Sequence, residues 1–308
     1  MNNIDILIPV CNEQDNVKPV IQKIHSSLSG SFNNINVIFI DDGSTDNTPE
    51  VISNLKKGPE SLNIKLVKLT NNFGKDLAIK CGMDYSSADL CAIIDGDLQQ
   101  PPEKIIEASN LIKQGYNVVH IEKKAYKNAR IFRRVGTFFF TKFISFLFGG
   151  VFHLTDYKVI DSKTVGMIKL FKEVNFFNRG IVELIGLKSI VIYYNPLRRI
   201  HGESKYSFFN ALKLAINSSI SVSLKPLRIS IYFGFIISAI SFIFGLFILY
   251  QKIFIGVPIL GFATIALATI FLGGIQLICL GVISEYLGKT FIESKNRPQY
   301  MIDYIKEI

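Results

Sequence analysis

The chain has 308 residues, of which 49% are apolar and 19% are charged, and this composition excludes a chain that is mainly disordered. Thirty-four lysines and arginines against 25 aspartates and glutamates give a net charge of +9, which suits an anionic surface such as nucleic acid or the cytoplasmic face of a membrane. The four cysteines have no paired or metal-ligand spacing, so we expect neither a disulfide framework nor a zinc site.

The N-terminal part of the chain alternates short apolar runs with segments of helical periodicity. The apolar runs predict strands at 4–10, 35–40, 64–69, 90–94 and 117–121. Helices are expected around 17–28, 48–57, 75–86 and 102–114. This order predicts a largely parallel α/β sheet with helices on both faces, and such sheets bind ligands at the carboxyl ends of their strands. Because a strand pattern begins at residue 4, we expect no signal peptide.

Acidic residues follow three of the expected strands, among them Asp41 and Asp42 after the second and Asp95 and Asp97 after the fourth. Grouped carboxylates cost free energy unless a cation or hydrogen-bond donors compensate them. Mg²⁺ and Mn²⁺ prefer one or two carboxylates together with phosphate oxygens. We therefore predict a divalent metal ion at Asp95, Asp97 and Gln99, with a diphosphate as its ligand. The chain contains neither a G-x-G-x-x-G nor a P-loop motif.

Two segments combine cations or polar residues with aromatic side chains at helical spacing. Residues 130–148 begin with three arginines and continue with a run of phenylalanines, and residues 207–227 carry an apolar face. Basic, aromatic-rich amphipathic helices lie in the headgroup plane of a membrane. We expect an interfacial helix at each segment, and an ordinary core helix remains an open alternative for the second.

The longest apolar segments lie near the C-terminus. Twenty-three uncharged residues separate Arg228 from Lys252, and 32 separate Lys252 from Glu285. About 20 apolar residues suffice to cross the hydrocarbon core of a bilayer. The sequence therefore predicts transmembrane helices at about 229–250 and 259–283.

Cations flank the outer ends of this helix pair, and the positive-inside rule places both chain ends in the cytoplasm of a cell with an inner membrane. We expect a cytoplasmic catalytic domain over 1–227, a transmembrane hairpin over 228–284 and a cytoplasmic tail over 285–308.

Several short motifs occur in order along nearly the whole chain. They occupy residues 8–13, 41–44, 72–75, 95–103, 202–206, 226–228, 272–276, 285–289 and 295–300. Together they resemble the family 2 inverting glycosyltransferases with a GT-A fold. Within that family they resemble the polyprenyl-phosphate sugar transferases, which include dolichol-phosphate mannose synthase and the bacterial bactoprenol glucosyltransferases of O-antigen modification. The last three motifs resemble the glucosyltransferase branch in particular.

The resemblance implies roles for individual side chains at the donor site. The nucleotide would be held by Pro9, Cys11, Glu13, Asp41, Asp42, Lys75 and Asp95. The metal ion, Mg²⁺ or Mn²⁺, would be bound by Asp95, Asp97 and Gln99. The catalytic residues implied are Asp97, Asp156, Arg199 and Lys205.

For the acceptor phosphate and the membrane surface, the residues concerned are Lys123, Arg130, Arg133, Arg134 and Ser204. The arginines among them could also simply attract lipid headgroups. The chain departs from the family at Asn71 and Lys158, where arginine is usual, and lysine keeps the charge without the bidentate fork. A phosphate monoester has a second pKa of about 6, so it is already an anionic nucleophile at neutral pH. A strong general base is therefore not required, and whether Asp156 orients a group or accepts a proton stays open.

The implied reaction is the inverting transfer of a hexose, glucose by closest resemblance, from a UDP-sugar to undecaprenyl phosphate at the cytoplasmic membrane face. The same resemblance suggests a homotetramer and a downstream flippase and periplasmic glycosyltransferase, with no nucleic acid partner. Alternatives are UDP-GlcNAc, UDP-Gal, GDP-Man or UDP-aminoarabinose as the donor, direct transfer to a membrane glycolipid, and a non-enzymatic nucleotide-sugar-binding scaffold. Processive synthases resemble one another in a Gln-x-x-Arg-Trp motif, whereas this chain has no tryptophan.

Overall fold

The computed structural model describes residues 3–55, 62–124, 153, 155–173, 176, 178–195, 225–255 and 261–308. The chain forms two compact units. The first contains residues 1–145, 150–208 and 297–308, and the second contains residues 146–149 and 209–296.

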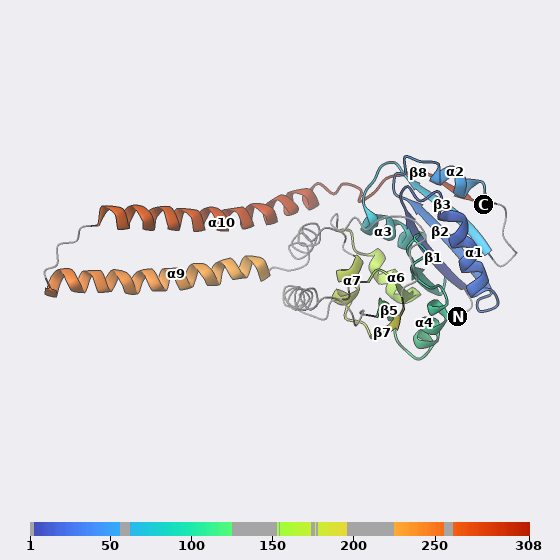
Figure 1. Ribbon diagram of the computed structural model, residues 1–308, viewed down its shortest axis with the longest axis horizontal. Coiled ribbons are helices and arrows are strands. Elements are labelled where there is room, and N and C mark those ends of the chain that lie inside the picture. The colour runs from blue at the N-terminus through green and yellow to red at the C-terminus, as the bar shows by residue number, and fades with distance from the viewer. Residues whose placement is uncertain are drawn as a thin grey trace. The chain divides into compact units, whose positions relative to one another are not determined.

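A sheet forms the centre of the first unit (Figure 1). Within the described residues it has eight strands in the order β7-β5-β6-β4-β1-β2-β3-β8. The strands are β1 (Asn3–Val10), β2 (Asn34–Asp41), β3 (Leu62–Leu69), β4 (Leu90–Ile93), β5 (Val118–Lys123), β6 (Lys158–Asp161), β7 (Ser189–Tyr194) and β8 (Ile302–Glu307). The four strands β4, β1, β2 and β3 are parallel, as are β5 and β7, whereas β6 and β8 are antiparallel to their neighbours.

Helices pack on both faces of this sheet, as the alternating pattern predicts. They are α1 (Val17–Leu28), α2 (Thr48–Ser53), α3 (Lys75–Tyr85), α4 (Lys104–Lys113), α6 (Ser162–Lys169) and α7 (Asn178–Ile185). Alternate residues of β1 enter two separate hydrophobic clusters, because successive side chains of a strand point to opposite faces. Gly82 lets α3 approach the sheet closely, since an added Cβ would lie 2.8 Å from Cδ1 of Ile40.

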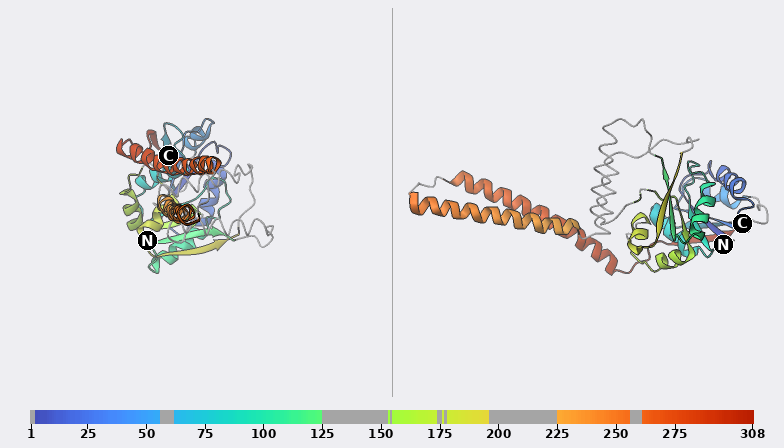
Figure 2. Two further views of the ribbon diagram at one scale, coloured as in Figure 1. Left: turned by 90° about the vertical axis from the view of Figure 1, so that its left-hand side faces the viewer. Right: turned by 90° about the horizontal axis from the view of Figure 1, so that it is seen from below.

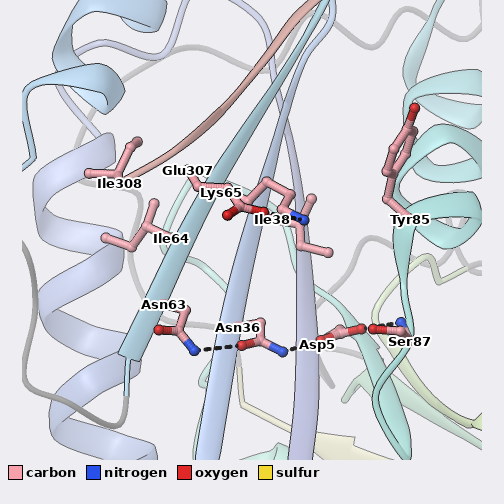
Figure 3. Close-up of a pocket in the computed structure, with 10 residues that line it drawn as sticks. All are labelled: Asp5, Asn36, Ile38, Asn63, Ile64, Lys65, Tyr85, Ser87, Glu307 and Ile308. Atoms are coloured by element: carbon pink, nitrogen blue, oxygen red, sulfur yellow. Dashed lines mark hydrogen bonds and ion pairs between the residues drawn. The ribbon is translucent and has the colours of Figure 1, made fainter.

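A row of polar side chains crosses the sheet near the amino ends of three strands (Figure 3). Asn63 Nδ2 donates to Asn36 Oδ1 at 3.0 Å, and Asn36 Nδ2 donates to Asp5 Oδ1 at 2.7 Å. The backbone N–H of Ser87 completes the row at Asp5 Oδ2, at 2.7 Å. The three side chains lie on residues that are paired in register, so their hydrogen bonds reinforce that register. A cavity of about 450 Å³ lies beside them.

The predicted strands and helices of the N-terminal part are confirmed to within a few residues. The sequence analysis did not predict β6, β7, α6 or α7. It also placed residues 302–307 in a tail, whereas they form β8, which pairs with β3 at the edge of the sheet. The expected domain boundaries at residues 227 and 284 stay a prediction.

The second unit contains two long apolar helices. They are α9 (Lys225–Tyr250), which continues into the π-helix η1 (Gln251–Ile255), and α10 (Phe262–Ser294). The views in Figures 1 and 2 show α9 and α10 running alongside each other. Segments Ile231–Ile255 and Ala268–Ser294 are long and apolar enough to cross a membrane, and their most apolar windows are not buried. Exposed apolar surface on this scale is unfavourable in water, so it favours a lipid environment.

Candidate active site

The loops that follow β1 and β2 are held together by hydrogen bonds. The Asn12 side-chain oxygen accepts from the backbone N–H of Thr45 at 2.8 Å, and the Asn12 backbone N–H donates to Ser44 Oγ at 2.9 Å. Asn12 adopts a φ of 58°, in the left-handed region that asparagine tolerates better than most residues. The Glu13 backbone N–H donates to Thr48 Oγ1 at 2.9 Å. These contacts fix one wall of the carboxyl edge of the sheet.

Asp41 ends β2 and Asp42 follows it directly, and the two residues are 0% and 4% exposed. Asp42 accepts from the backbone N–H groups of Phe73, at 2.7 Å, and Gly74, at 2.9 Å. Asp41 Oδ1 accepts from the Ser44 N–H at 3.3 Å, whereas its buried Oδ2 has no hydrogen-bond partner among the described residues. Burial raises the pKa of both carboxyls above the ordinary range. Asp41 therefore offers a buried acceptor atom that the described protein does not satisfy.

Cys11 and Gly43 lie against the loop that follows β3. Asn72 Nδ2 donates to the exposed Cys11 Sγ at 3.3 Å. Gly43 has a φ of 69°, and a Cβ there would lie 2.5 Å from the backbone nitrogen of Asn72, so only glycine fits. Pro9 lies in β1, opposite Ile40 of β2. The predicted nucleotide residues thus gather at neighbouring strand ends, and their contacts with a nucleotide stay a prediction.

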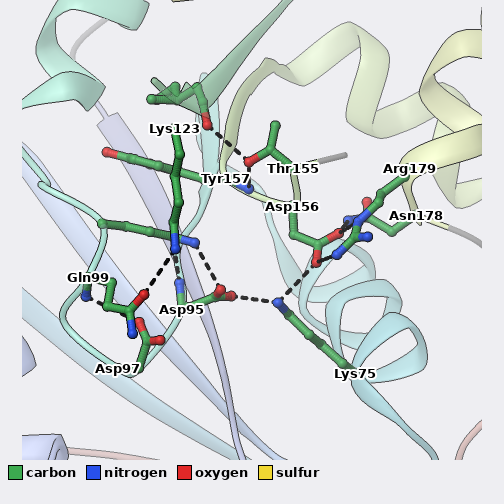
Figure 4. A network of polar contacts seen from close by, with 12 residues as sticks. Lys75, Asp95, Asp97, Gln99, Lys123, Thr155, Asp156, Tyr157, Asn178 and Arg179 are labelled. Atoms are coloured by element: carbon green, nitrogen blue, oxygen red, sulfur yellow. Dashed lines mark hydrogen bonds and ion pairs between the residues drawn. The ribbon is translucent and has the colours of Figure 1, made fainter. Parts of the chain in front are cut away.

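An ion-pair network joins Lys75, the first residue of α3, to two acidic residues (Figure 4). Lys75 Nζ lies 2.7 Å from Asp95 Oδ1 and 3.0 Å from Asp156 Oδ2. Arg179 binds the same Asp156 carboxylate through both oxygens, with Nε 2.8 Å from Oδ1 and Nη2 2.6 Å from Oδ2. The Lys75 side chain is 43% exposed along its length, and its ammonium group bridges the two carboxylates.

The electrostatics of this network keep Asp156 ionised. Burial alone would raise the pKa of Asp156, but the hydrogen bonds from Arg179 and the charge of Lys75 outweigh it, and that pKa lies well below the ordinary range. Burial also opposes the charge of Lys75, yet Asp95 and Asp156 raise its pKa above the usual value. A carboxylate that is so acidic is a poor proton acceptor near neutral pH.

Asp95 and Asp97 lie in the loop after β4, as predicted. Asp95 Oδ2 accepts from Gln100 Nε2 at 2.9 Å, and Asp97 Oδ1 accepts from the Gln99 backbone N–H at 3.1 Å. The Gln99 side-chain oxygen accepts from Lys123 Nζ at 2.9 Å. Lys123, which was predicted at the acceptor phosphate, therefore lies at the acidic loop.

The same loop contains a residue in an uncommon backbone conformation. Leu98, between Asp97 and Gln99, has a φ of 60°. This left-handed conformation costs a non-glycine residue roughly 1–2 kcal/mol. Residues in such unfavourable backbone conformations are common in loops that position side chains for binding.

Sequence reasoning missed three residues of this site. Arg179 and Asn178 begin α7, and Asn178 Nδ2 lies 3.3 Å from Asp156 Oδ1. Gln100 holds Asp95 through its side chain and also accepts from the Asp95 backbone N–H at 2.9 Å. The only sequence signal for Gln100 was its place after the D-x-D pair. Arg179 had no sequence signal, because it lies 23 residues after Asp156 in a segment without a predicted element.

Some predicted residues lie outside the described part of the chain. These are Arg130, Arg133, Arg134, Arg199, Ser204 and Lys205, together with the expected interfacial helix at 130–148 and all but the last residues of that at 207–227.

The family model described as Glycosyl transferase family 2 matches residues 5–169. The uncharacterized glycosyltransferase YkcC of Bacillus subtilis is 32% identical over 96% of this chain and 92% of its own. The bactoprenol glucosyl transferase of Shigella phage SfV is 31% identical over 99% of both chains.

One solved structure supports the fold alone. The mannosyltransferase PcManGT of Pyrobaculum calidifontis, solved with GDP-Man and Mn²⁺, aligns with a TM-score of 0.50 at 13% identity, over 73% of this chain and 64% of its own. The fold is therefore GT-A-like, with a mostly parallel sheet, as the sequence predicted. With the family match over more than half of its length, the chain belongs to glycosyl transferase family 2.

Proposed function

We propose that this glycosyltransferase transfers a hexose, glucose in the first instance, from a UDP-sugar to undecaprenyl phosphate. The observation that carries the proposal is the similarity to a bactoprenol glucosyl transferase at 31% identity over 99% of both chains. That similarity includes the apolar helices α9 and α10 as well as the sheet, and a lipid acceptor requires a protein held at a membrane. The placement of cations favours a catalytic unit and both chain ends in the cytoplasm.

The donor site would use the carboxyl ends of β1, β2 and β4. Asp41 Oδ2, which lacks a partner among the described residues, is suited to accept a hydrogen bond from a base N–H or a ribose hydroxyl. Lys75 Nζ lies between Asp95 and Asp156, so its charge is placed to meet a phosphate near those carboxylates.

The acidic loop fits a divalent cation that takes part of its ligands from the donor. Asp97 is partly exposed, and its Oδ1 accepts from the Gln99 backbone N–H. Asp95 pairs with Lys75 and the Gln99 oxygen accepts from Lys123, so a cation would share these oxygens with neighbouring lysines, and Asp97 is proposed as a further ligand. No three His, Cys, Asp or Glu side chains gather for a metal ion in the part of the chain that is described. Mg²⁺ and Mn²⁺ commonly take one or two protein carboxylates together with phosphate oxygens of the substrate.

When bound, the cation would neutralise the charge that develops on the leaving diphosphate. The acceptor phosphate attacks the anomeric carbon as an anion, and no proton has to be removed from it above its second pKa of about 6. Asp156, held ionised by Arg179 and Lys75, is proposed to orient these cations and not to act as a base. Lys123, together with Arg130, Arg133, Arg134, Arg199 and Lys205, would supply further counter-charge to the acceptor, and Ser204 would donate a hydrogen bond to it.

The test is transfer of label into lipid. Full-length protein in detergent is incubated with radiolabelled UDP-glucose, Mg²⁺ or Mn²⁺ and undecaprenyl phosphate, with UDP-GlcNAc, UDP-Gal, GDP-Man and UDP-aminoarabinose in parallel. We expect an organic-extractable product that requires the added polyprenyl phosphate. Label that reaches only a glycolipid, or binding of the nucleotide sugar without turnover, would contradict the proposal. A homotetramer, a flippase and a periplasmic glycosyltransferase are the partners proposed with this reaction.

Asp41→Asn is expected to stabilise the fold and to weaken nucleotide binding. Because burial raises the folded-state pKa of Asp41, its ionised form costs stability once the pH exceeds the ordinary carboxyl range. The variant should gain about 1 kcal/mol at pH 7–8 and nothing at low pH, where both side chains are neutral. Thermal unfolding between roughly pH 4 and 8 and calorimetry with UDP measure the two effects.

The matched control is Asp303→Asn, which removes an exposed carboxylate that lies 3.2 Å from Lys68. This variant should neither gain stability with rising pH nor lose affinity for UDP. Equal stability of wild type and Asp41→Asn at pH 8, with unchanged UDP affinity, would exclude the proposed role of Asp41.

A further inference from the structure

The motif at residues 295–300 has no role in the proposed reaction, yet the structure gives it defined contacts. It connects the end of α10 to β8. The Gln299 side-chain amide donates to the backbone carbonyl of Glu173. The Tyr300 hydroxyl donates to Asp84 Oδ2 at 2.8 Å. The next residue, Met301, accepts from the Thr70 N–H at 3.0 Å, which begins the pairing with β3.

Tyr300 joins a partly buried group of polar side chains on α3, in which Lys80 is buried and Asp84 is 26% exposed. Lys80 of α3 is 2% exposed and forms an ion pair with Asp84, one helical turn further on. Its ammonium group also lies 6.0 Å from the ring centre of Phe176. A charge that is taken out of water is best stabilised when its partner's remaining hydrogen-bonding positions are also satisfied. The Tyr300 hydroxyl satisfies the second oxygen of Asp84.

The motif contacts the two parts of the chain whose side chains bind Asp156. One contact is with α3, and the other is with the segment that leads into α7. Lys75 begins α3, and Asp84 lies near its end, about 13 Å away along a rigid helix. Glu173 and Phe176 precede α7, whose first residues include Arg179. The helices are also joined directly, because Asp76 Oδ1 accepts from the backbone N–H at the start of α7, at 3.3 Å.

We infer that Tyr300 is a positioning residue of the active site, which fixes α3 and thereby the place of Lys75 between Asp95 and Asp156. The chain that returns from α10 is thus anchored on the helix that carries this lysine. The inference rests on the proposed function only for the catalytic importance of Lys75.

The first experiment compares Tyr300→Phe with Tyr304→Phe in the full-length protein. Tyr304 lies on β8 and its ring contacts Lys68 instead of α3, so it controls for loss of a hydroxyl in the same segment. Without substrate, amide hydrogen exchange over residues 75–85 should accelerate by about three- to tenfold in Tyr300→Phe, the factor of one ordinary hydrogen bond. It should be unchanged in Tyr304→Phe. Equal exchange in both variants would overturn the inference whatever the substrate is.

The second experiment is a double-mutant cycle with Lys75→Ala, read as transfer of hexose to undecaprenyl phosphate. Tyr300→Phe should lower kcat about three- to tenfold with little change in KM, and should have no further effect in the Lys75→Ala background. The same loss in both backgrounds would mean that Tyr300 acts only on general stability, and the inference would fail while the function stands. Full activity of Lys75→Ala would instead overturn the proposed role of Lys75, and with it this inference.

Discussion

Asp97→Asn is expected to lower kcat by about two to three orders of magnitude while leaving the yield and melting temperature of the protein unchanged. Asp97 is partly exposed, and its Oδ1 accepts from the Gln99 backbone N–H, which an asparagine oxygen can still accept. The substitution therefore removes charge with little change in the fold. Transfer of radiolabelled hexose into an organic extract measures the loss.

Two controls separate a metal ligand from a merely acidic surface residue. Glu107→Gln removes a carboxylate of α4 that pairs with Lys104 at 2.6 Å and is half exposed, and it should keep full activity. EDTA should abolish the activity of the wild type, and added Mg²⁺ or Mn²⁺ should restore it. Full activity of Asp97→Asn, or of the wild type in EDTA, would refute the assignment of a metal ion to the acidic loop.

The parts of the fold that the sequence predicts well have a strong periodic signal. Strands β1 to β5 are rich in apolar residues, and α1 places Val17, Val20, Ile24 and Leu28 on one buried face. Strand β8 escaped prediction because the sequence Ile302–Glu307 is half charged and its side chains are mostly exposed. Its formation depends on pairing with β3, on the ion pair of Lys68 with Asp303 and on the contact of Tyr300 with Asp84, all of which are distant in sequence.

Some residues of the candidate site could likewise be predicted from the sequence, and others could not. Asp41, Asp42, Asp95 and Asp97 stand at strand ends, and the parallel order of the strands brings them to one edge of the sheet. Arg179 could not be found from spacing, because its approach to Asp156 requires α7 to pack beside α3. Ion pairs between elements that are distant in the chain produce no periodic pattern in a single sequence.

Asp156→Asn is expected to lower kcat about a hundredfold by the same factor at every pH tested. The wild-type carboxylate lies 3.0 Å from Lys75 Nζ and 2.6 Å from Arg179 Nη2. The NH₂ group of an asparagine cannot accept hydrogen bonds from these two cations, so one of them would lose its partner. Because Arg179 and Lys75 hold the pKa of Asp156 well below its usual range, the group does not titrate between roughly pH 5 and 9. The acidic limb of the wild-type profile should instead follow the acceptor phosphate, near pH 6.

The stability of the same variant tests the electrostatic argument independently of substrate. A carboxyl whose folded-state pKa is lowered contributes stability above its unfolded-state pKa, and that stability is lost only as the pH falls through the folded-state value. Asp156→Asn should therefore lower the free energy of unfolding by about 2 kcal/mol at neutral pH, and the deficit should shrink only in strong acid.

Arg179→Ala provides the matched partner for this test, because Arg179 and Asp156 share two hydrogen bonds. The double variant should be hardly less stable than Asp156→Asn alone, since each single change already breaks the same pair. If Asp156 were instead the catalytic base, Asp156→Asn would abolish the acidic limb of the kcat profile. Arg179→Ala would then shift that limb to higher pH, because it removes the cation that keeps the carboxylate acidic.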